Sequence, residues 1–330
     1  MEELGEKPFR GRQLFEWIHK KQVKSYEEMT DLPRLLRESL EKTRPIRTVR
    51  CVKELVSKKD GTRKYLFALH DENVIESVFM RYKHGNTACI SSQVGCNMGC
   101  TFCASTLEGC VRDLTASEML AQIYEMQRLT GERLSNVVVM GSGEPLDNYV
   151  NLTRFIRLIT DPGGQGMSGR NLTVSTCGLV PGIRQLALEG FTLTLALSLH
   201  GATDEKRRRI MPVAKVWSIS ELMEACRFYH EHTQRRITFE YALVKGVNDS
   251  LEDARDLAHL ASDLGAHINL IPVNPVEETG ARRPSRAALE EFRSELERRG
   301  ANATVRRELG PDINAACGQL RRGVSRCSEQ

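Results

Sequence analysis

The feature that most limits the fold of this chain is a regular alternation of short apolar runs and amphipathic segments after residue 86. Six runs have strand character, and each is followed by a segment with helical periodicity. Six such units in series predict a parallel sheet, although periodicity does not distinguish a partial barrel from an open, doubly wound sheet. We expect strands at 88–92, 136–140, 171–175, 192–199, 236–243 and 267–272, and helices at about 115–130, 148–159, 181–189, 218–232, 250–263 and 285–299.

The first of these helices has clear ends in the sequence. Thr115 and Glu118 have the spacing of a capping box, and Leu114 can pack on Met119 as a hydrophobic staple. Gly131 follows as a stop signal.

Two smaller regions precede this alternating core. Residues 1–48 are charged and helical in pattern, with Leu14, Phe15 and Ile18 on one face, and predict a small accessory domain. Two strand-like runs, 64–69 and 74–80, predict a β-hairpin within a linker or extension of residues 49–85. The core is then expected at 86–310, with a C-terminal segment at 311–330.

Charge and hydropathy exclude several classes of protein. Lys and Arg number 47 against 43 Asp and Glu, a formal net charge of +4, which is too mild for a polybasic tail protein but allows a local patch for an anionic partner. No apolar run approaches the ~18 residues of a membrane helix, and charges interrupt the N-terminus where a signal peptide would be apolar. We therefore expect a soluble, cytoplasmic protein with no membrane partner.

Polar and glycine-rich segments follow several of the predicted strands. In both candidate architectures the functional site lies at the carboxyl ends of the strands, so these segments should meet on one rim. They are Gly141–Pro145, Ser175–Gly178, Ser198–His200 and Pro272–Pro275. The glycine-rich stretch 161–169 lacks the strand and the Gly-Lys pair of a phosphate loop, and we interpret it as flexible surface.

Ten cysteines cannot form a standing disulfide framework in a reducing compartment, so their positions are the informative feature. Cys96, Cys100 and Cys103 have CxxxCxxC spacing, which indicates a metal site. A zinc site would need a fourth ligand, for which Cys110 or His84 is available. In a 4Fe-4S cluster, three ligands leave one iron open, which can chelate S-adenosylmethionine and reduce it to a 5′-deoxyadenosyl radical.

The three-cysteine spacing resembles that of the radical S-adenosylmethionine enzymes. In Gly143-Glu144-Pro145, Glu144 fits the family's pattern as the carboxylate that meets the ligand's ammonium group. Without the cysteine loop this segment would be interpreted as an ordinary turn.

Longer motifs sharpen the resemblance. They are Ala88–Cys96, Gly141–Asn148, Ser198–His200, Ile268–Pro275 and Asp312–Leu320. Together they resemble the dual-specificity RNA adenine-C2 methyltransferases of the RlmN type, over essentially residues 10–325. The resemblance implies an α/β fold with a partial (β/α)6 TIM-like barrel and an N-terminal helical domain of RNA-binding type.

The same resemblance implies the reaction and its partners. The substrates would be adenines in 23S rRNA and in the tRNA anticodon loop. The cofactors would be one three-cysteine-ligated 4Fe-4S cluster and S-adenosylmethionine, two molecules per turnover. An electron donor such as flavodoxin or ferredoxin, and a monomeric enzyme, are also implied.

Two cysteines and one glutamate have reactive roles by this resemblance. Carbon 2 of adenine is a poor nucleophile, so a radical route is needed. Cys317 matches the carrier, which is methylated by one S-adenosylmethionine and loses hydrogen to the radical from a second. Cys89 matches the partner that attacks the carrier's sulfur, forms a transient Cys89–Cys317 disulfide and frees the RNA, and Glu76 matches the proton acceptor.

Blander interpretations exist for each of these residues. A lone cysteine is usually a small buried hydrophobe, and Glu76 in its apolar run could be a solvent-facing strand position. Departures from the family pattern occur at Cys110, Cys177 and Val273, and we assign no role to Cys51, Cys226 and Cys327. The expected contacts to S-adenosylmethionine are Gly143, Glu144, Ser175, Ser198, Leu199, His200 and Asn274.

Basic groups that recur along the chain could contact RNA phosphates, or could pair with neighbouring glutamates. They are Lys206–Arg209, Arg235-Arg236, Arg282-Arg283, Arg298-Arg299, Arg306-Arg307 and Arg321-Arg322. Two alternatives to the leading function stay open. One is methylation of adenine carbon 8 by the same machinery, although Leu146 after Glu144-Pro145 favours carbon 2, and the other is a non-enzymatic Fe-S or zinc RNA-binding module.

Overall fold

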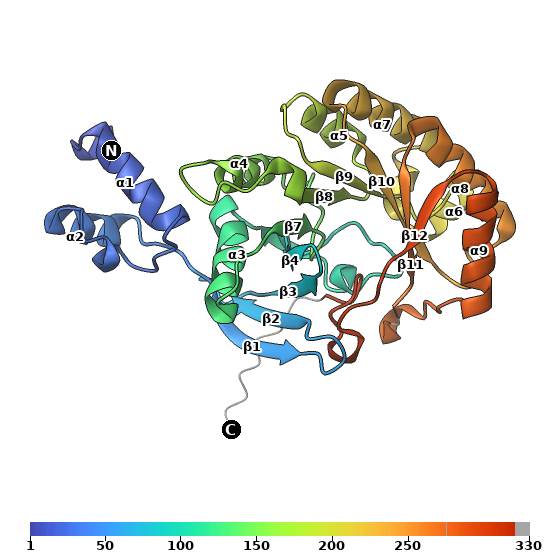
Figure 1. Cartoon of the computed structure of the whole chain (residues 1–330), viewed down its shortest axis with the longest axis horizontal. Coiled ribbons are helices and arrows are strands. Elements are labelled where there is room, and N and C mark those ends of the chain that lie inside the picture. Colours follow the sequence, from blue (N-terminus) through green and yellow to red (C-terminus); the bar gives the residue numbers. More distant parts are fainter. Residues whose placement is uncertain (275, 321–330) are drawn as a thin grey trace.

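The computed structural model describes residues 1–274 and 276–320, and has three parts (Figure 1). A small helical unit at the N-terminus is joined to a large sheet covered by helices. A C-terminal segment then returns to strands near the start of the sheet.

The sheet contains ten strands, and its two edges, β1 and β12, do not pair with each other in the described part of the chain. The first four strands pair antiparallel, and every pair from β4 onward is parallel. In spatial order the strands are β1 (Arg50–Val56), β2 (Arg63–Ala68), β3 (Val74–Tyr82), β4 (Gly85–Cys89), β7 (Asn136–Val139), β8 (Leu172–Thr176), β9 (Thr194–Ser198), β10 (Ile237–Leu243), β11 (His267–Pro272) and β12 (Asn302–Val305). This is the arrangement of an incomplete barrel.

The six predicted strands and six predicted helices are confirmed, with ends that shift by three residues at most. The helices are α3 (Ala116–Thr130), α4 (Tyr149–Thr160), α5 (Val180–Ala187), α7 (Ile219–Thr233), α8 (Leu251–Leu264) and α9 (Arg286–Arg298). Helix α6 (Asp204–Ile210) and strand β12 were not predicted, because each is too short to show a period. Short 3-10 turns span Glu2–Leu4, Tyr26–Glu28, Ala104–Thr106, Gly169–Asn171, Pro212–Lys215, Glu277–Thr279 and Pro311–Ile313.

The predicted cap of α3 is present. The Thr115 hydroxyl accepts a hydrogen bond from the Glu118 N–H, and the Glu118 carboxylate accepts one from the Thr115 N–H at 2.9 Å. Gly131 ends the helix in the left-handed conformation, with φ of +67°. The local sequence therefore determines both ends of α3.

The predicted hairpin is confirmed as β2 and β3, but its strands belong to the main sheet. Strand β3 pairs with β4, and β1 adds a further strand outside β2. A separate two-stranded ribbon, β5 (Gln93–Gly95) with β6 (Cys110–Asp113), brackets the segment between them. That segment holds the three-cysteine loop.

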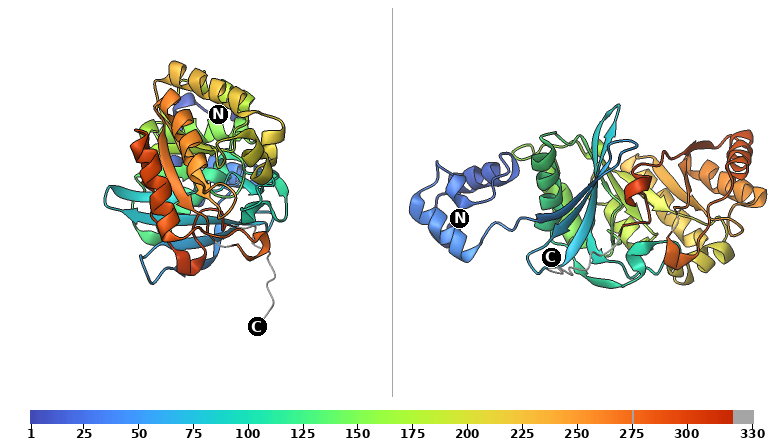
Figure 2. Two further views of the ribbon diagram at one scale, coloured as in Figure 1. Left: turned by 90° about the vertical axis from the view of Figure 1, so that its right-hand side faces the viewer. Right: turned by 90° about the horizontal axis from the view of Figure 1, so that it is seen from below.

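The N-terminal unit has its own apolar cluster and few contacts with the rest (Figure 2). Helices α1 (Pro8–His19) and α2 (Arg34–Thr43) enclose it. His19 Nδ1 lies 3.0 Å from the Tyr124 hydroxyl of α3, and the Gln165 side-chain amide donates to the His19 carbonyl at 2.6 Å. The glycine-rich stretch 161–169 thus packs against α1, which its composition alone did not indicate.

A buried glutamine joins α3 to β3 and to the chain just after β4. Gln122 is fully buried, and its Oε1 accepts hydrogen bonds from the Ser77 hydroxyl at 2.7 Å and the Ser91 N–H at 2.9 Å. Its Nε2 donates to the Ser91 carbonyl at 3.1 Å. These bonds hold the helix against β3 and against the chain just after β4, near the start of the three-cysteine loop. No helix among the described residues is long and apolar enough to span a membrane.

Replacing Gln122 with leucine should destabilise the fold, because the Ser77 hydroxyl and the backbone groups of Ser91 would remain buried without these partners. We expect the free energy of unfolding to fall by about 2 kcal/mol or more, measured by urea unfolding. Val150→Ala, at a position of α4 that is 77% exposed, is the control and should change it by less than about 0.5 kcal/mol. Equal effects of the two changes would contradict the inferred role of Gln122.

Candidate active site

Three cysteines lie on one loop between β5 and the 3-10 turn Ala104–Thr106. The Cys103 N–H donates to the Cys100 carbonyl at 3.1 Å, so the loop turns sharply there. The Cys96 N–H donates to the Gly109 carbonyl at 3.1 Å, which ties the start of the loop to its return. Cys96 is buried, and Cys100 and Cys103 are half-buried.

Two glycines near this loop have no room for a side chain. Gly95 has φ of +82°, and a Cβ there would lie 1.9 Å from the Gly109 carbonyl oxygen. Gly143 has φ of +108°, and a Cβ there would lie 2.6 Å from the Cβ of Gln93. Glycine at 95 therefore lets the start of the cysteine loop approach its own return, and glycine at 143 lets the loop that bears Glu144 approach β5.

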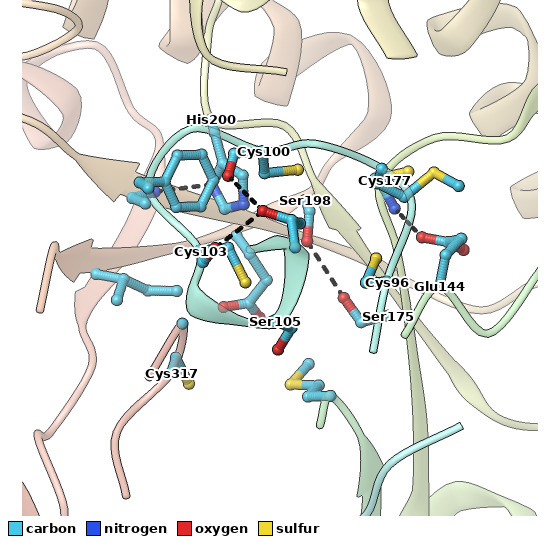
Figure 3. A pocket seen from close by; sticks show the side chains of 18 of the residues that line it. Cys96, Cys100, Cys103, Ser105, Glu144, Ser175, Cys177, Ser198, His200 and Cys317 are labelled. Carbon is cyan, nitrogen blue, oxygen red and sulfur yellow. Dashed lines mark hydrogen bonds between the residues drawn. The ribbon is translucent and has the colours of Figure 1, made fainter. Parts of the chain in front are cut away.

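A cavity of about 160 Å³ lies between the cysteine loop and the carboxyl ends of the parallel strands (Figure 3). Segments from many regions of the chain, between Cys96 and Gly318, contribute to its wall, and Figure 3 shows Cys317 facing it from the C-terminal segment. Its lining includes the predicted residues Cys96, Cys100, Cys103, Gly143, Glu144, Ser175, Ser198, His200, Asn274 and Cys317.

The donor set of the loop suits an iron–sulfur cluster. Iron–sulfur clusters are bound by cysteine thiolates, and each cysteine binds a different iron, so the thiols need not converge on one point. Burial raises the pKa of Cys96 to about 12 and also raises those of Cys100 and Cys103. Bound metal supplies the positive charge that such thiols need to ionise. Among residues 1–274 and 276–320, no three His, Cys, Asp or Glu side chains gather closely enough to hold a single metal ion.

Glu144 is held rigidly at the cavity. Its two carboxylate oxygens accept hydrogen bonds from the N–H groups of Cys177 at 2.7 Å and Leu146 at 3.0 Å. Its own N–H donates to the Gln93 side chain at 2.8 Å. Burial raises the pKa of Glu144, so a cationic group of a ligand would stabilise its ionised form.

Ser175 and Ser198 face each other across β8 and β9, with their hydroxyl oxygens 3.2 Å apart (Figure 3). His200 follows β9 with a left-handed φ of +53°. Its Nδ1 accepts a hydrogen bond from the Ala242 N–H at 2.9 Å, which leaves its Nε2 as the proton-bearing nitrogen. Burial, with a smaller effect of the Arg207 charge, lowers the pKa of His200 to about 3, so the ring is neutral at physiological pH.

Of the predicted contacts to S-adenosylmethionine, Leu199 and Asn274 lie in different environments. The Leu199 side chain is fully buried in the main apolar core and does not line the cavity. Its N–H donates to the Glu240 carbonyl at 3.1 Å. The Asn274 side chain lies in the cavity wall and donates to the Cys317 carbonyl at 3.0 Å, so it positions the C-terminal cysteine as well.

Cys317 lies between two cavities. A second cavity of about 230 Å³ shares with the first only the residues Ile271, Asn274, Arg306 and Cys317. The other residues of the second cavity include Tyr82, Arg283 and Arg307. Cys317 can therefore be reached from a side that faces the cysteine loop and from a more basic side.

Cys89 is buried beside the same segment. It packs with Val78, Met80, Leu309 and Ala315. Burial, and next the neighbouring Cys317, raises the pKa of Cys89 to about 12, whereas Arg306 acts in the opposite direction. The structure therefore brings Cys89 and Cys317 into one neighbourhood without joining them, since both are free thiols.

Arg306 and Glu240 are site residues that the sequence interpretation missed. Arg306 was considered only as part of a basic pair, but it lines both cavities and lies 3.5 Å from the Glu240 carboxylate. The Cys317 thiolate, and next the Glu240 carboxylate, raise the pKa of Arg306. Glu240 is the single charged residue in the apolar run of β10, and this pattern could have indicated a functional side chain.

The alternative placement of Glu76 at a solvent-facing position is wrong. Glu76 is 6% exposed, and its carboxylate lies 3.0 Å from the Lys64 ammonium group. Strand alternation puts it on the same face of β3 as Val78 and Met80, which pack against the C-terminal segment. Glu76 does not line either of the two cavities.

The basic groups proposed for RNA divide into buried, paired and exposed residues. Arg207 is fully buried and donates to the carbonyls of Cys177 and Leu199, so it cannot reach RNA. Arg298 and Arg299 both pair with Glu295. Exposed members include Arg236, Arg282 and Arg307. Arg321-Arg322 lie outside the described residues.

The cysteines without an expected role have different environments. Cys177 lines the first cavity, and its N–H donates to Glu144. Cys110 lies on β6 and, like His84, does not line that cavity. Cys226 is in the main core, Cys51 packs at its edge, and Cys327 lies outside the described residues.

Comparison with known proteins gives matches over the whole chain. Residues 90–260 match the family model of the radical SAM superfamily, and residues 1–46 match that of the ribosomal RNA large subunit methyltransferase N-terminal domain. Two curated relatives, from Lachnospira eligens and Lachnoclostridium phytofermentans, are both named probable dual-specificity RNA methyltransferase RlmN. They are 55% and 52% identical, covering 96% and 98% of this chain and 91% and 90% of their own lengths.

A solved structure is also similar. The crystal structure of a radical SAM methyltransferase from Sphaerobacter thermophilus superimposes with a TM-score of 0.91 at 43% identity. The match covers 96% of this chain and 94% of that one. The partial-barrel prediction of radical SAM type is thereby confirmed.

Replacing Gly143 with alanine should weaken the binding of S-adenosylmethionine by about tenfold or more, because the added Cβ forces the Glu144 loop away from Gln93. Equilibrium binding to the iron-reconstituted protein is the measurement. Gly11→Ala in α1 is the matched control, since its Cβ would make an ordinary 3.4 Å contact with Met1. Unchanged affinity in the Gly143 variant would contradict this view of the loop.

Proposed function

This chain belongs to the RlmN family of radical S-adenosylmethionine RNA methyltransferases, and from that premise we propose that it methylates carbon 2 of adenine in 23S rRNA and in the tRNA anticodon loop. It is an enzyme that transfers one-carbon groups. One observation supports the reaction most directly. Cys317 faces the cavity of the three-cysteine loop and has a second cysteine, Cys89, beside its segment.

The radical SAM family implies a 4Fe-4S cluster and S-adenosylmethionine. We assign the cluster to Cys96, Cys100 and Cys103, where, when bound, it supplies the electron that cleaves S-adenosylmethionine to a 5′-deoxyadenosyl radical. Glu144 would meet the ammonium group of S-adenosylmethionine. The remaining contacts to S-adenosylmethionine would come from residues that line the first cavity, namely Gly143, Ser175, Ser198, His200 and Asn274. Leu199 would contribute only through its backbone.

Cys317 is the proposed methyl carrier. Its thiolate accepts a methyl group from one S-adenosylmethionine, and the resulting S-methyl group would lose a hydrogen atom to the 5′-deoxyadenosyl radical from a second molecule, which becomes 5′-deoxyadenosine. Asn274 holds the Cys317 carbonyl, and Arg306 lines the same two cavities as Cys317. The two-sided access to Cys317 suits a group that is loaded from one cavity and delivers into the other.

Cys89 is the proposed resolving thiol. Its apolar surroundings keep it protonated, so it does not compete with Cys317 as a methyl acceptor. Once the RNA adduct has formed, Cys89 loses its proton and its sulfur attacks the sulfur of Cys317, which breaks the bond between the Cys317 sulfur and the transferred carbon and frees the RNA. The transient disulfide is later reduced. Glu76 is the proposed acceptor of the adenine proton.

RNA binding would use exposed arginines and the N-terminal unit. The salt dependence of binding should reflect the phosphates that these residues contact. We further propose that the enzyme acts as a cytoplasmic monomer and receives electrons from flavodoxin or ferredoxin. The target adenine would flip out of its base stack before it reacts at Cys317.

Anaerobic reconstitution followed by nucleoside mass spectrometry tests the function. We expect about four irons per chain and 2-methyladenosine in ribosomal and transfer RNA treated with S-adenosylmethionine and reductant. The product 8-methyladenosine would instead identify the sister activity. One zinc per chain and no methylated nucleoside would leave an RNA-binding module as the function.

The two reactive cysteines can be separated by single substitutions. Cys317→Ala should abolish the S-methyl group detected by peptide mass spectrometry, and a methyl group found on another residue would refute the assignment. Cys89→Ala should still load the methyl group and attach to RNA but fail to release it, so a covalent protein–RNA adduct accumulates. Normal turnover in the Cys89 variant would rule out its role in resolution.

A further inference from the structure

A buried lysine stands beside the proposed proton acceptor. Lys64 Nζ lies 3.0 Å from Glu76 Oε1, and each side chain is 8% exposed. Lys64 is opposite Val78 in the β2–β3 register and Leu66 is opposite Glu76, so the pair is diagonal across two strands. Burying two charges costs solvation free energy, and removing one partner leaves the other uncompensated.

The same ammonium group also contacts the C-terminal segment. Lys64 Nζ donates to the Asn314 carbonyl oxygen at 3.2 Å. Asn314 has a left-handed φ of +50° and precedes Cys317 by three residues. One side chain therefore links the strand that bears Glu76 to the segment that bears the carrier cysteine.

Other contacts anchor this segment to the β1–β2 turn. The Gly310 N–H donates to Asp60 Oδ2 at 2.9 Å, and the Ser57 hydroxyl donates to Asp312 Oδ1 at 2.6 Å. The Lys58 N–H donates to the other Asp312 oxygen at 3.0 Å. These anchors fix the position of the segment without using the Glu76 carboxylate, so anchoring and a role through Glu76 can be separated by mutation.

We propose that Lys64 is a positioning residue that sets Glu76 against the RNA adduct on Cys317 for the proton-transfer stage of the reaction. The inference rests on the proposed function, in which the proton on adenine carbon 2 passes to the Glu76 carboxylate. The contact between the Lys64 ammonium group and the Glu76 carboxylate, at 3.0 Å, limits the positions that this buried carboxylate can take. Its second hydrogen bond fixes the segment on which the adenine would be carried.

The test follows the reaction in two stages with iron-reconstituted protein. In Lys64→Met, methyl loading of Cys317 should be unchanged by peptide mass spectrometry, because that stage needs no acceptor of the adenine proton. Release of methylated RNA in a single turnover should fall by about tenfold or more, with accumulation of the protein–RNA adduct. Lys64→Arg should restore most of the release, since a guanidinium can keep both contacts.

Two further variants separate the effect of the Lys64 charge from its effect as an anchor of the C-terminal segment. Lys64→Gln keeps an N–H donor for Asn314 but lacks the charge, and it should also stall at the adduct, so it carries the test if the methionine variant does not fold. Ser57→Ala removes one anchor of the same segment without touching Glu76, and it should release RNA normally because the Lys58 N–H and Asp60 still hold the segment. A stall of equal size in Ser57→Ala, or an equal loss of methyl loading in Lys64→Met, would show that Lys64 is only an anchor and overturn the proposal.

Glu76→Gln separates this inference from the proposed function. If Glu76→Gln stalls at the adduct and both uncharged Lys64 variants release RNA normally, the positioning role of Lys64 is refuted while the base remains. If Glu76→Gln itself releases RNA at the normal rate, the proton-acceptor role of Glu76 fails, and the positioning role of Lys64 fails with it.

Discussion

The return of residues 309–320 onto the sheet is the constraint on which the site depends. The segment is held from three directions, because the Ala104 N–H donates to the Gly318 carbonyl at 2.8 Å, Asn274 donates to the Cys317 carbonyl, and the β1–β2 turn binds Asp312. Without these bonds the cavity would have only the cysteine loop and the strand ends as walls. The partial barrel supplies the frame, and this short irregular segment completes the chemistry.

Much of the fold could be predicted because its long elements have strong periods and clear caps, as α3 shows with Thr115 and Gly131. The failures have physical causes. Helix α6 and strand β12 are too short for a period to appear. Alternation within β3 left the solvent as the plausible environment of Glu76, because no local pattern reveals that a segment 240 or so residues away in the chain covers that face.

The site was predicted residue by residue through resemblance, and the structure adds what resemblance did not specify. It excludes the Leu199 side chain from the cavity, and it assigns Arg207 to holding two strand-end loops together. It also shows two ion pairs near the C-terminal segment, the buried pair of Lys64 with Glu76 and the pair of half-buried Arg306 with buried Glu240. Arg306 and Glu240 are 66 residues apart, so spacing could not indicate their contact. Lys64 and Glu76 lie on neighbouring strands of the predicted hairpin, but the hairpin pattern does not show that the pair is buried.

The separation in sequence between the C-terminal segment and its anchors also sets an order of assembly. Ser57 and Asp312 are 255 residues apart, and Lys64 and Asn314 are 250 apart. At the usual rate of translation the anchors leave the ribosome about 10–50 s before their partners. The nascent barrel therefore presents its three-cysteine loop while one wall of the cavity has yet to be synthesised. Cys317 is therefore among the last residues of the cavity wall to be made.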